Sequence, residues 1–330
     1  MKLKGLAVTV AILAVLAAGA FWANRAPAPA RADPRVGQPL GDPAAIGQAA
    51  AIRLSDQGKS IALTRGPDGA WRDASYYDLP ADFSKLAGLA SDLVAARIQR
   101  LVTTNPDRLA RLEFKDTQIE FRDAGGRPLW SVTLGKSPDA GGGRFVRFAG
   151  EDKAYLANLS AWIDTDPKNW ANAQLLDLKP DDVAKVGVTF DPSGSVVLTR
   201  TTQNGGWTAG AAAAGRKVNA DAVASLLASL GTVRFSDTSD PADPAVAAAR
   251  QHLRTITFTT FAGQTTVVAL GRKPEEKKPA VPAGPVYVFI TSSDPRAPIN
   301  AWMKTRAFQV DEYTFTGLPQ KPDDLFAAGK

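Results

Sequence analysis

The fold is decided by a pattern that occurs twice: IALTR at residues 61–65, followed after a turn by Trp71, and VVLTR at residues 196–200, followed after a turn by Trp207. The two copies begin about 135 residues apart, and further matching segments follow each copy in the same order. Self-similarity at a fixed spacing indicates that one folding unit was duplicated. A chemical motif in one copy can therefore be compared with the equivalent position in the other.

Both copies consist mainly of short runs that alternate apolar and polar residues, separated by turn sequences. Such alternation predicts antiparallel strands with one buried face. After each tryptophan, apolar residues recur at helical spacing, which predicts a packed helix. The helical stripes are Phe83, Leu86, Ala90, Leu93, Val94 and Arg97 in copy one, and Val223, Leu226, Leu227 and Leu230 in copy two.

We therefore predict the α+β class, with two tandem duplicated units of antiparallel sheet and packed helix after an N-terminal transmembrane helix. The first unit is expected at residues 46–178 and the second at residues 179–318. Residues 319–330 are expected to form a C-terminal tail. At 330 residues the chain is long enough for two ordinary domains.

Residues 1–23 are predicted to be a membrane anchor. Residues 5–24 contain no charge, and about 20 residues at roughly 1.5 Å each span the hydrocarbon core of a bilayer. The alternative is a signal peptide cleaved after residues 30–32, although that site lies about ten residues beyond the apolar run. The Pro- and Ala-rich residues 24–45 are expected to form an extended, semi-rigid spacer. Because an anchor or a signal peptide implies export, the folded part is expected in the periplasm.

Composition excludes several functional classes. The chain has no cysteine, which rules out disulfides, thiolate metal sites, a cysteine nucleophile and a lipid-modified N-terminal cysteine. The formal net charge is +6, but Lys2, Lys4, Arg25 and Arg31 all flank the N-terminal apolar segment, so the remaining chain is nearly neutral. We therefore expect no nucleic-acid partner.

Two motifs that suggest chemistry are better explained by the scaffold. LGKS at residues 134–137 resembles the end of a phosphate-binding loop, but Trp130 stands where that motif needs a glycine, and copy two has LGRK at residues 270–273. His252 is the only histidine. It is placed at the end of a helix expected over residues 245–253, where a cation complements the helix dipole.

Clusters of acidic residues are the remaining catalytic candidates. Asp177, Asp181 and Asp182 form one group, and Asp164 and Asp166 form another. Carboxylates in such groups can bind calcium or cleave glycosides. Proline followed by acids is also an ordinary helix start, which we favour. We therefore predict no catalytic residue, no cofactor and no metal site.

Tyr76 and Tyr77 are candidate binding residues, because they lie in the loop between Trp71 and the first predicted helix. Aromatic residues in loops can stack on sugars or on partner proteins. Copy two has only alanine at residues 211–214, the equivalent place. A function of this pair would therefore belong to copy one alone.

The order of these segments resembles a bacterial family known as domain of unknown function 4340. The resemblance covers roughly residues 45–315 and is carried by the anchor, the two tryptophan hairpins, the strand end at Gly135 and the closing stretch DPKNWANAQLLDL at residues 166–178. It implies a membrane-anchored protein of the cell envelope. Some relatives look like auxiliary components of gliding-motility-type ABC transporter systems.

The family pattern also places an arginine shortly after the tryptophan of the closing stretch. Copy two has Arg306 after Trp302, whereas copy one has Asn172 and Ala173 in the corresponding stretch. Trp302 and Arg306 therefore join the two tyrosines as candidate partner or ligand contacts.

The function expected from the sequence is that of a non-enzymatic, single-pass inner-membrane protein with a periplasmic folded part. It would bind an envelope or transporter protein as an accessory or scaffold. The alternative is a module that binds glycan or peptide, in the cleft between the copies and at the tyrosine pair. An envelope hydrolase is the third hypothesis, and it is the weakest because no acid pair recurs in both copies.

Overall fold

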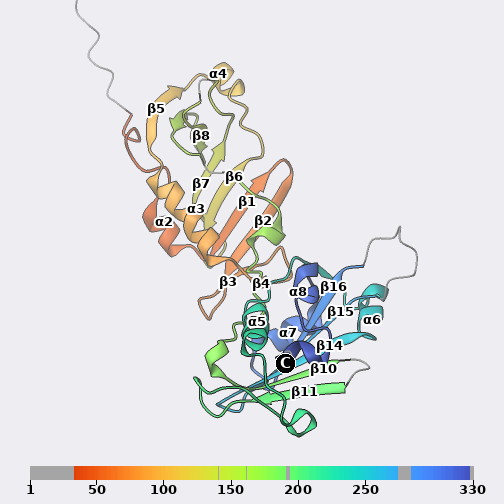
Figure 1. Cartoon of the computed structure of the whole chain (residues 1–330). Helices are drawn as coiled ribbons and strands as arrows, with labels where there is room; N and C mark the ends of the chain where they lie inside the picture. The colour runs from red at the N-terminus through yellow and green to blue at the C-terminus, as the bar shows by residue number, and fades with distance from the viewer. Residues whose placement is uncertain (1–32, 140, 161, 191–193, 274–283, 328–330) are drawn as a thin grey trace, which may run out of the picture. The chain divides into compact units, whose positions relative to one another are not determined.

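The computed structural model describes residues 33–139, 141–160, 162–190, 194–273 and 284–327 (Figure 1). The expected anchor at residues 1–23, the first part of the expected spacer, and most of the loop at residues 273–285 lie outside these ranges. Within them, no helix is both long enough and apolar enough to span a bilayer. The described chain has two antiparallel sheets and several helices, which confirms the α+β class.

The chain divides into two compact units, and the first is interrupted by a segment of the second. Unit 1 comprises the chain up to Gly66 together with Ser84–Thr165, and unit 2 comprises Pro67–Phe83 together with the chain from Asp166 onward. The hairpin that carries Trp71, Tyr76 and Tyr77 therefore belongs to unit 2, although it lies within the first copy of the sequence pattern.

In unit 1 the strands follow one another in the sheet in the order β2-β1-β6-β7-β8-β9-β5. Helix α3 packs on this sheet through Leu86, Leu89 and Leu93, which are buried. The strands are β1 (Ala51–Asp56), β2 (Lys59–Arg65), β5 (Ile98–Thr103), β6 (Gln118–Arg122), β7 (Pro128–Leu134), β8 (Arg144–Phe148) and β9 (Ala154–Ala157), and the helices are α2 (Pro43–Gln48), α3 (Phe83–Ala95) and α4 (Pro106–Ala110).

The core of unit 1 follows the period-two pattern read from the sequence. Leu54 pairs with Ile61 on one neighbouring strand and with Ile119 on the other, and all three side chains are buried. Alternate residues of a strand point to the same face, so this register places one apolar row in the core. The predicted helical stripe is wrong at both ends: Phe83 is 69% exposed, and Arg97 is exposed and lies beyond the end of α3.

In unit 2 the order is β12-β11-β10-β14-β15-β16-β17-β13. The hairpin β3–β4 belongs to this compact unit but not to its sheet. The strands are β3 (Trp71–Asp73), β4 (Leu79–Pro80), β10 (Val183–Phe190), β11 (Gly194–Thr199), β12 (Thr208–Ala209), β13 (Asp237–Ser239), β14 (Leu253–Thr260), β15 (Thr265–Gly271), β16 (Val286–Ser292) and β17 (Ala307–Val310). The α-helices are α5 (Ala220–Gly231), α6 (Pro244–Ala249), α7 (Pro298–Thr305) and α8 (Glu312–Thr316), and the 3-10 helices are η1 (Pro167–Trp170), η2 (Pro180–Asp182), η3 (Ala211–Ala213) and η4 (Pro322–Leu325).

The stripe predicted for the second helix is confirmed: Val223, Leu226, Leu227 and Leu230 of α5 are all buried. They pack in the main apolar cluster of unit 2, which also contains Tyr76. The same cluster includes Leu325 and Phe326, so part of the segment expected as a C-terminal tail is folded into the core.

The described part of the expected spacer is packed rather than extended. Leu40 is 1% exposed, and the backbone N–H of Gly37 donates to the carbonyl of Ile98 at 2.7 Å. Asp33 accepts a 2.8 Å hydrogen bond from the ammonium of Lys153, which fastens the start of this segment to the sheet. Proline content predicted a segment with few backbone partners, but strand β5 and helix α3 supply those partners here.

The strand-end glycines have the same structural role in both units. A Cβ on Gly135 would lie 2.4 Å from the carbonyl oxygen of Leu112, and a Cβ on Gly271 would lie 2.4 Å from the carbonyl oxygen of Ala249. In each case a carbonyl group at or just after the end of a short helix, α4 or α6, lies against the end of a strand, β7 or β15. The LGK and LGR motifs are therefore explained by close backbone approach.

Candidate functional site

The turn between β3 and β4 has an unusual backbone. The N–H of Leu79 donates to the carbonyl of Tyr76 at 3.2 Å, and the two residues between them, Tyr77 and Asp78, have φ of 57° and 56°. Two consecutive positive φ values define a type I′ turn, which normally uses asparagine and glycine. A bulky residue in this region costs about 1 kcal/mol or more, so the surroundings must hold Tyr77 in place.

Tyr76 holds the turn from inside unit 2. Its side chain is only 9% exposed, and its ring stacks on that of Phe235 with centroids 6.3 Å apart. Its hydroxyl lies 3.4 Å from Oδ1 of Asp237 and 3.3 Å from Oγ1 of Thr238, both on the edge strand β13. Burial raises the pKa of Tyr76 above its usual value. The ring of Tyr76 is therefore a packing group, and its hydroxyl lies beside two side chains of β13.

Tyr77 has the opposite environment. Its side chain is 52% exposed, and the guanidinium carbon of Arg306 lies 3.9 Å from the ring centroid. Arg306 in turn donates to Oγ1 of Thr238 through Nε at 3.3 Å and Nη2 at 3.2 Å. We call Tyr76, Tyr77, Thr238 and Arg306 the tyrosine–arginine cluster. It presents an aromatic ring beneath a cation, which is a favourable cation–π arrangement.

Trp302, the fourth residue predicted from the sequence, supports Arg306 through the backbone. Its side chain is partly buried against the core of unit 2. Its carbonyl accepts a 3.0 Å hydrogen bond from the N–H of Arg306, at the end of α7. Of the four predicted residues, the structure brings Tyr76, Tyr77 and Arg306 into direct side-chain contact.

Asp73 lies at the base of the same turn, and sequence reasoning did not single it out. The residue is fully buried; its Oδ1 accepts from the N–H of Ser75 at 2.9 Å, whereas its Oδ2 has no hydrogen-bond partner. Burial raises the pKa of Asp73 from 3.8 to about 6. A buried carboxyl group prefers its neutral form because desolvation penalises the charge.

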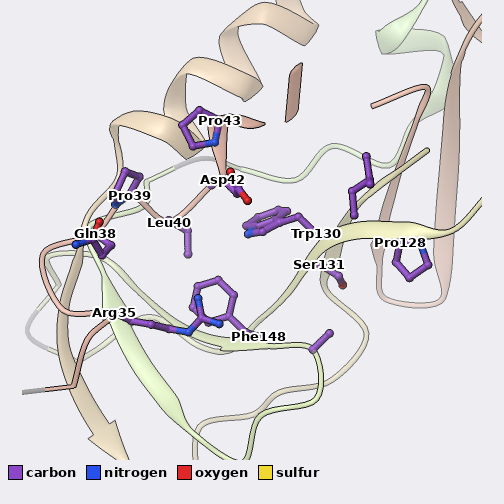
Figure 2. Close-up of a pocket in the computed structure, with 13 residues that line it drawn as sticks. Arg35, Gln38, Pro39, Leu40, Asp42, Pro43, Pro128, Trp130, Ser131 and Phe148 are labelled. Carbon is purple, nitrogen blue, oxygen red and sulfur yellow. The ribbon is translucent and has the colours of Figure 1, made fainter. Parts of the chain in front are cut away.

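Unit 1 contains a cavity of about 560 Å³ that the sequence did not reveal (Figure 2). Figure 2 shows the indole of Trp130 projecting into it, with Leu40 and Asp42 on one side and Arg35 and Phe148 on the other. The residues that line it include Arg35, Leu40, Asp42, Trp130, Ser131 and Phe148. The only sequence signal was a tryptophan on an otherwise aliphatic strand face. Residues 35–43, which were expected to form part of the spacer, line the cavity opposite Trp130.

The remaining sequence candidates occupy ordinary structural positions. His252 is exposed, and its N–H donates to the carbonyl of Ala249, where α6 ends earlier than predicted. Asp166 caps η1 through a 3.1 Å bond from the N–H of Lys168. Across the described ranges, no three Asp, Glu or His side chains gather in a way that would hold a metal ion.

A family model described as a domain of unknown function (DUF4340) matches residues 71–251. The chain belongs to the DUF4340 family. No curated protein and no solved structure matches it. The DUF4340 match begins at Trp71 and includes Tyr76, Tyr77 and Thr238, whereas Arg306 lies beyond its end. The N-terminal wall of the unit 1 cavity lies before its start.

Proposed function

We propose that this protein is a non-enzymatic, membrane-anchored accessory protein of the cell envelope, and that unit 2 binds a partner protein through the tyrosine–arginine cluster. The observation that carries this proposal is Tyr77, a half-exposed tyrosine held in a strained conformation beneath Arg306. Strained residues persist where the surroundings impose them, and such outliers concentrate at functional sites.

The chemistry of the cluster favours protein recognition. Tyrosine and arginine are enriched among residues that contribute most to binding energy at interfaces. Both side chains are already fixed, Tyr77 by the turn and Arg306 by its two bonds to Thr238. Binding would therefore cost little side-chain entropy. Because Arg306 brings a cation beside an aromatic ring, a partner segment with a carboxylate next to an apolar side chain is complementary.

The edge strand itself argues for recognition by side chains rather than by addition of a strand. The N–H of Thr238 donates to Oδ1 of Asp237 at 2.7 Å, and the hydroxyl of Tyr76 lies 3.4 Å from the same oxygen. A partner strand would need such backbone groups for its own ladder. The partner is therefore expected to dock onto the rings and the guanidinium.

Membrane attachment is the second part of the proposal and rests on the apolar residues 1–23. The packed chain starts at Asp33, so only about ten residues remain as tether. Because the packed chain begins so soon after the apolar residues, a partner close to the bilayer is favoured, such as a component of an ABC-type transporter.

Duplication is supported by the strand orders. Strands β2-β1-β6-β7-β8-β9-β5 of unit 1 correspond one by one, in sequence and in sheet position, to β11-β10-β14-β15-β16-β17-β13 of unit 2. The proposed repeat boundaries at residues 46–178 and 179–318 differ from the compact units in the β3–β4 hairpin, in the residues before 46, in the stretch at residues 166–178 and at the C-terminus.

Photocrosslinking in intact bacterial cells tests the docking surface. A photoreactive amino acid at position 77 is compared with one at Tyr313, which is 73% exposed and lies elsewhere in unit 2. We expect position 77, and not position 313, to yield a discrete adduct with a membrane protein after purification through the C-terminus. No adduct at position 77, or identical adducts at both positions, would contradict the proposal.

The anchor is tested separately by the mass of the mature protein. An intact N-terminus supports the anchor, whereas a mature chain beginning at Asp33 would show that the apolar segment is a cleaved signal peptide.

A further inference from the structure

The cavity of unit 1 has the size and lining of a small-ligand site. At about 560 Å³ it falls within the range of pockets that hold compact ligands. Trp130, which projects into it (Figure 2), is fixed from behind by an edge-to-face contact with Phe121 at 5.7 Å. The indole is therefore a rigid apolar platform rather than a mobile surface side chain.

Polar groups of fixed orientation surround this platform. Nε of Arg35 donates to Oε1 of Glu151 at 2.9 Å, and its Nη2 contacts the same oxygen, while the guanidinium carbon lies 4.1 Å from the centroid of Phe148. Asp42 accepts from the N–H of Ala44 at 2.9 Å, which orients its carboxylate. These are donors and acceptors positioned before any ligand arrives.

Ser131 lies one residue further along β7, and its Oγ accepts a 2.8 Å hydrogen bond from Nε2 of Gln118. Successive side chains of a strand point to opposite faces, so this hydroxyl group faces away from the indole of Trp130. Leu40, which is 1% exposed, adds an apolar side chain to the lining. The lining thus combines a flat aromatic surface with donors and acceptors around its rim.

The charges of the lining favour a neutral ligand. The cation of Arg35 is compensated by Glu151, and the carboxylate of Asp42 lies at the N-terminus of α2, where the dipole favours it. A strongly anionic or cationic ligand would meet a group that is already compensated. A ligand with one apolar face and many hydroxyl groups at its edge would match both features of the lining.

We propose that this cavity binds a neutral saccharide about the size of a disaccharide. One sugar ring would stack its C–H face on the indole of Trp130, and its hydroxyl groups would bond to Asp42 and the guanidinium of Arg35. The site lies in unit 1 and is independent of the tyrosine–arginine cluster, so either proposal can fail without the other.

Calorimetric titration of the full chain tests the site. The protein is kept in a detergent without a sugar headgroup, because a maltoside would compete for the cavity. The probes are N,N′-diacetylchitobiose and cellobiose, with an alternating Ala-Pro hexapeptide as the competing ligand class. We expect saturable binding of at least one disaccharide with one site per chain and no binding of the peptide.

Two variants and a matched control locate the binding. Trp130→Ala should weaken saccharide affinity about tenfold or more. Asp42→Asn should weaken it while preserving the helix cap, since asparagine caps as well as aspartate. Trp162→Ala is the control, because Trp162 is 79% exposed in the same unit and lies outside this cavity. It should leave the affinity unchanged.

Far-ultraviolet circular dichroism confirms that each variant is folded before titration. Absence of binding by the folded wild-type chain would overturn the proposal. So would tight binding of the peptide in place of the sugars, or a folded Trp130→Ala chain with unchanged affinity.

Discussion

Unit 1 and unit 2 share one strand order but present different surfaces. In unit 1 an aromatic side chain, Trp130, projects into a hollow whose polar rim is fixed by ion pairing and helix capping. In unit 2 an aromatic side chain, Tyr77, sits on a strained turn and is covered by Arg306. A common scaffold has therefore acquired a concave surface in one unit and a protruding one in the other, through loops and side chains alone.

The largest expected effect separates the two neighbouring tyrosines. Tyr76→Ala should lower the free energy of unfolding by about 3–4 kcal/mol, because it removes a buried ring from the core of unit 2. Tyr76→Phe, which removes only the hydroxyl group, should cost about 1 kcal/mol. Urea unfolding followed by circular dichroism measures both. Equal losses for the two variants would show that the hydroxyl bonds to β13, and not the ring, hold the turn.

The pH dependence of stability tests the base of the same turn. The pKa of Asp73 is raised to about 6 in the folded state, from 3.8, so the folded chain binds more protons than the unfolded chain between about pH 4 and pH 6. The contribution of Asp73 to the free energy of unfolding is therefore fully present below pH 4. It is lost as the pH rises through 6, and the loss is on the order of 2 kcal/mol.

Asp73→Asn should remove that decline, since asparagine keeps the oxygen that accepts from Ser75 but cannot ionise. The measurement is the unfolding free energy of both chains from pH 4 to pH 7.5. If the two curves stay parallel, Asp73 is not the titrating group.

The shared scaffold predicts the same response at the strand-end glycines. Gly135→Ala and Gly271→Ala should each destabilise by about 2 kcal/mol, because the new Cβ would overlap a carbonyl oxygen. Gly88→Ala is the control: it lies in α3, where a Cβ would meet nothing within 4 Å. There we expect a gain of about 0.5–1 kcal/mol in thermal or chemical unfolding. A loss at only one of the two strand ends would argue against equivalent roles in the two units.

The substitution of Tyr77 should have the smallest effect on stability, but it should abolish binding of the partner protein. Tyr77→Asn should change the unfolding free energy by less than about 1 kcal/mol, since relief of the left-handed strain offsets the lost ring contacts. In this variant the photoreactive amino acid is placed at another position near the tyrosine–arginine cluster. We expect that the crosslinked adduct with the partner protein is no longer formed. A strongly destabilised Tyr77→Asn chain would mean that the ring serves folding rather than docking.

Local patterns allowed much of the fold to be predicted. Apolar alternation identified the strands around Leu54 and Ile61, and the stripe of α5 was correct at all four positions. The LGK motif was rightly assigned to the scaffold, because its counterpart in copy two lacks the same chemistry. These features depend on neighbours in the sequence, which is what periodicity reports.

The candidate site was only partly predictable, because its contacts are long-range. Tyr77 and Arg306 were predicted for separate reasons. Nothing in the sequence indicated that the guanidinium of Arg306 lies over the ring of Tyr77. Tyr76 looked like its neighbour, but its environment depends on Phe235 and Thr238, which lie about 160 residues further along the chain. The unit 1 cavity was missed because composition suggested an extended spacer for residues that form one of its walls.

The position of the β3–β4 hairpin has a consequence for how the protein is made and divided. The hairpin leaves the ribosome long before Thr238 and Arg306, so it must wait for most of the chain before its final contacts can form. A gene cut at residue 179 would yield a second half that lacks Tyr76 and Leu79, which belong to the apolar core of unit 2. We expect such a fragment to expose apolar side chains and to aggregate, whereas a fragment that keeps residues 67–83 linked to it would remain a monomer.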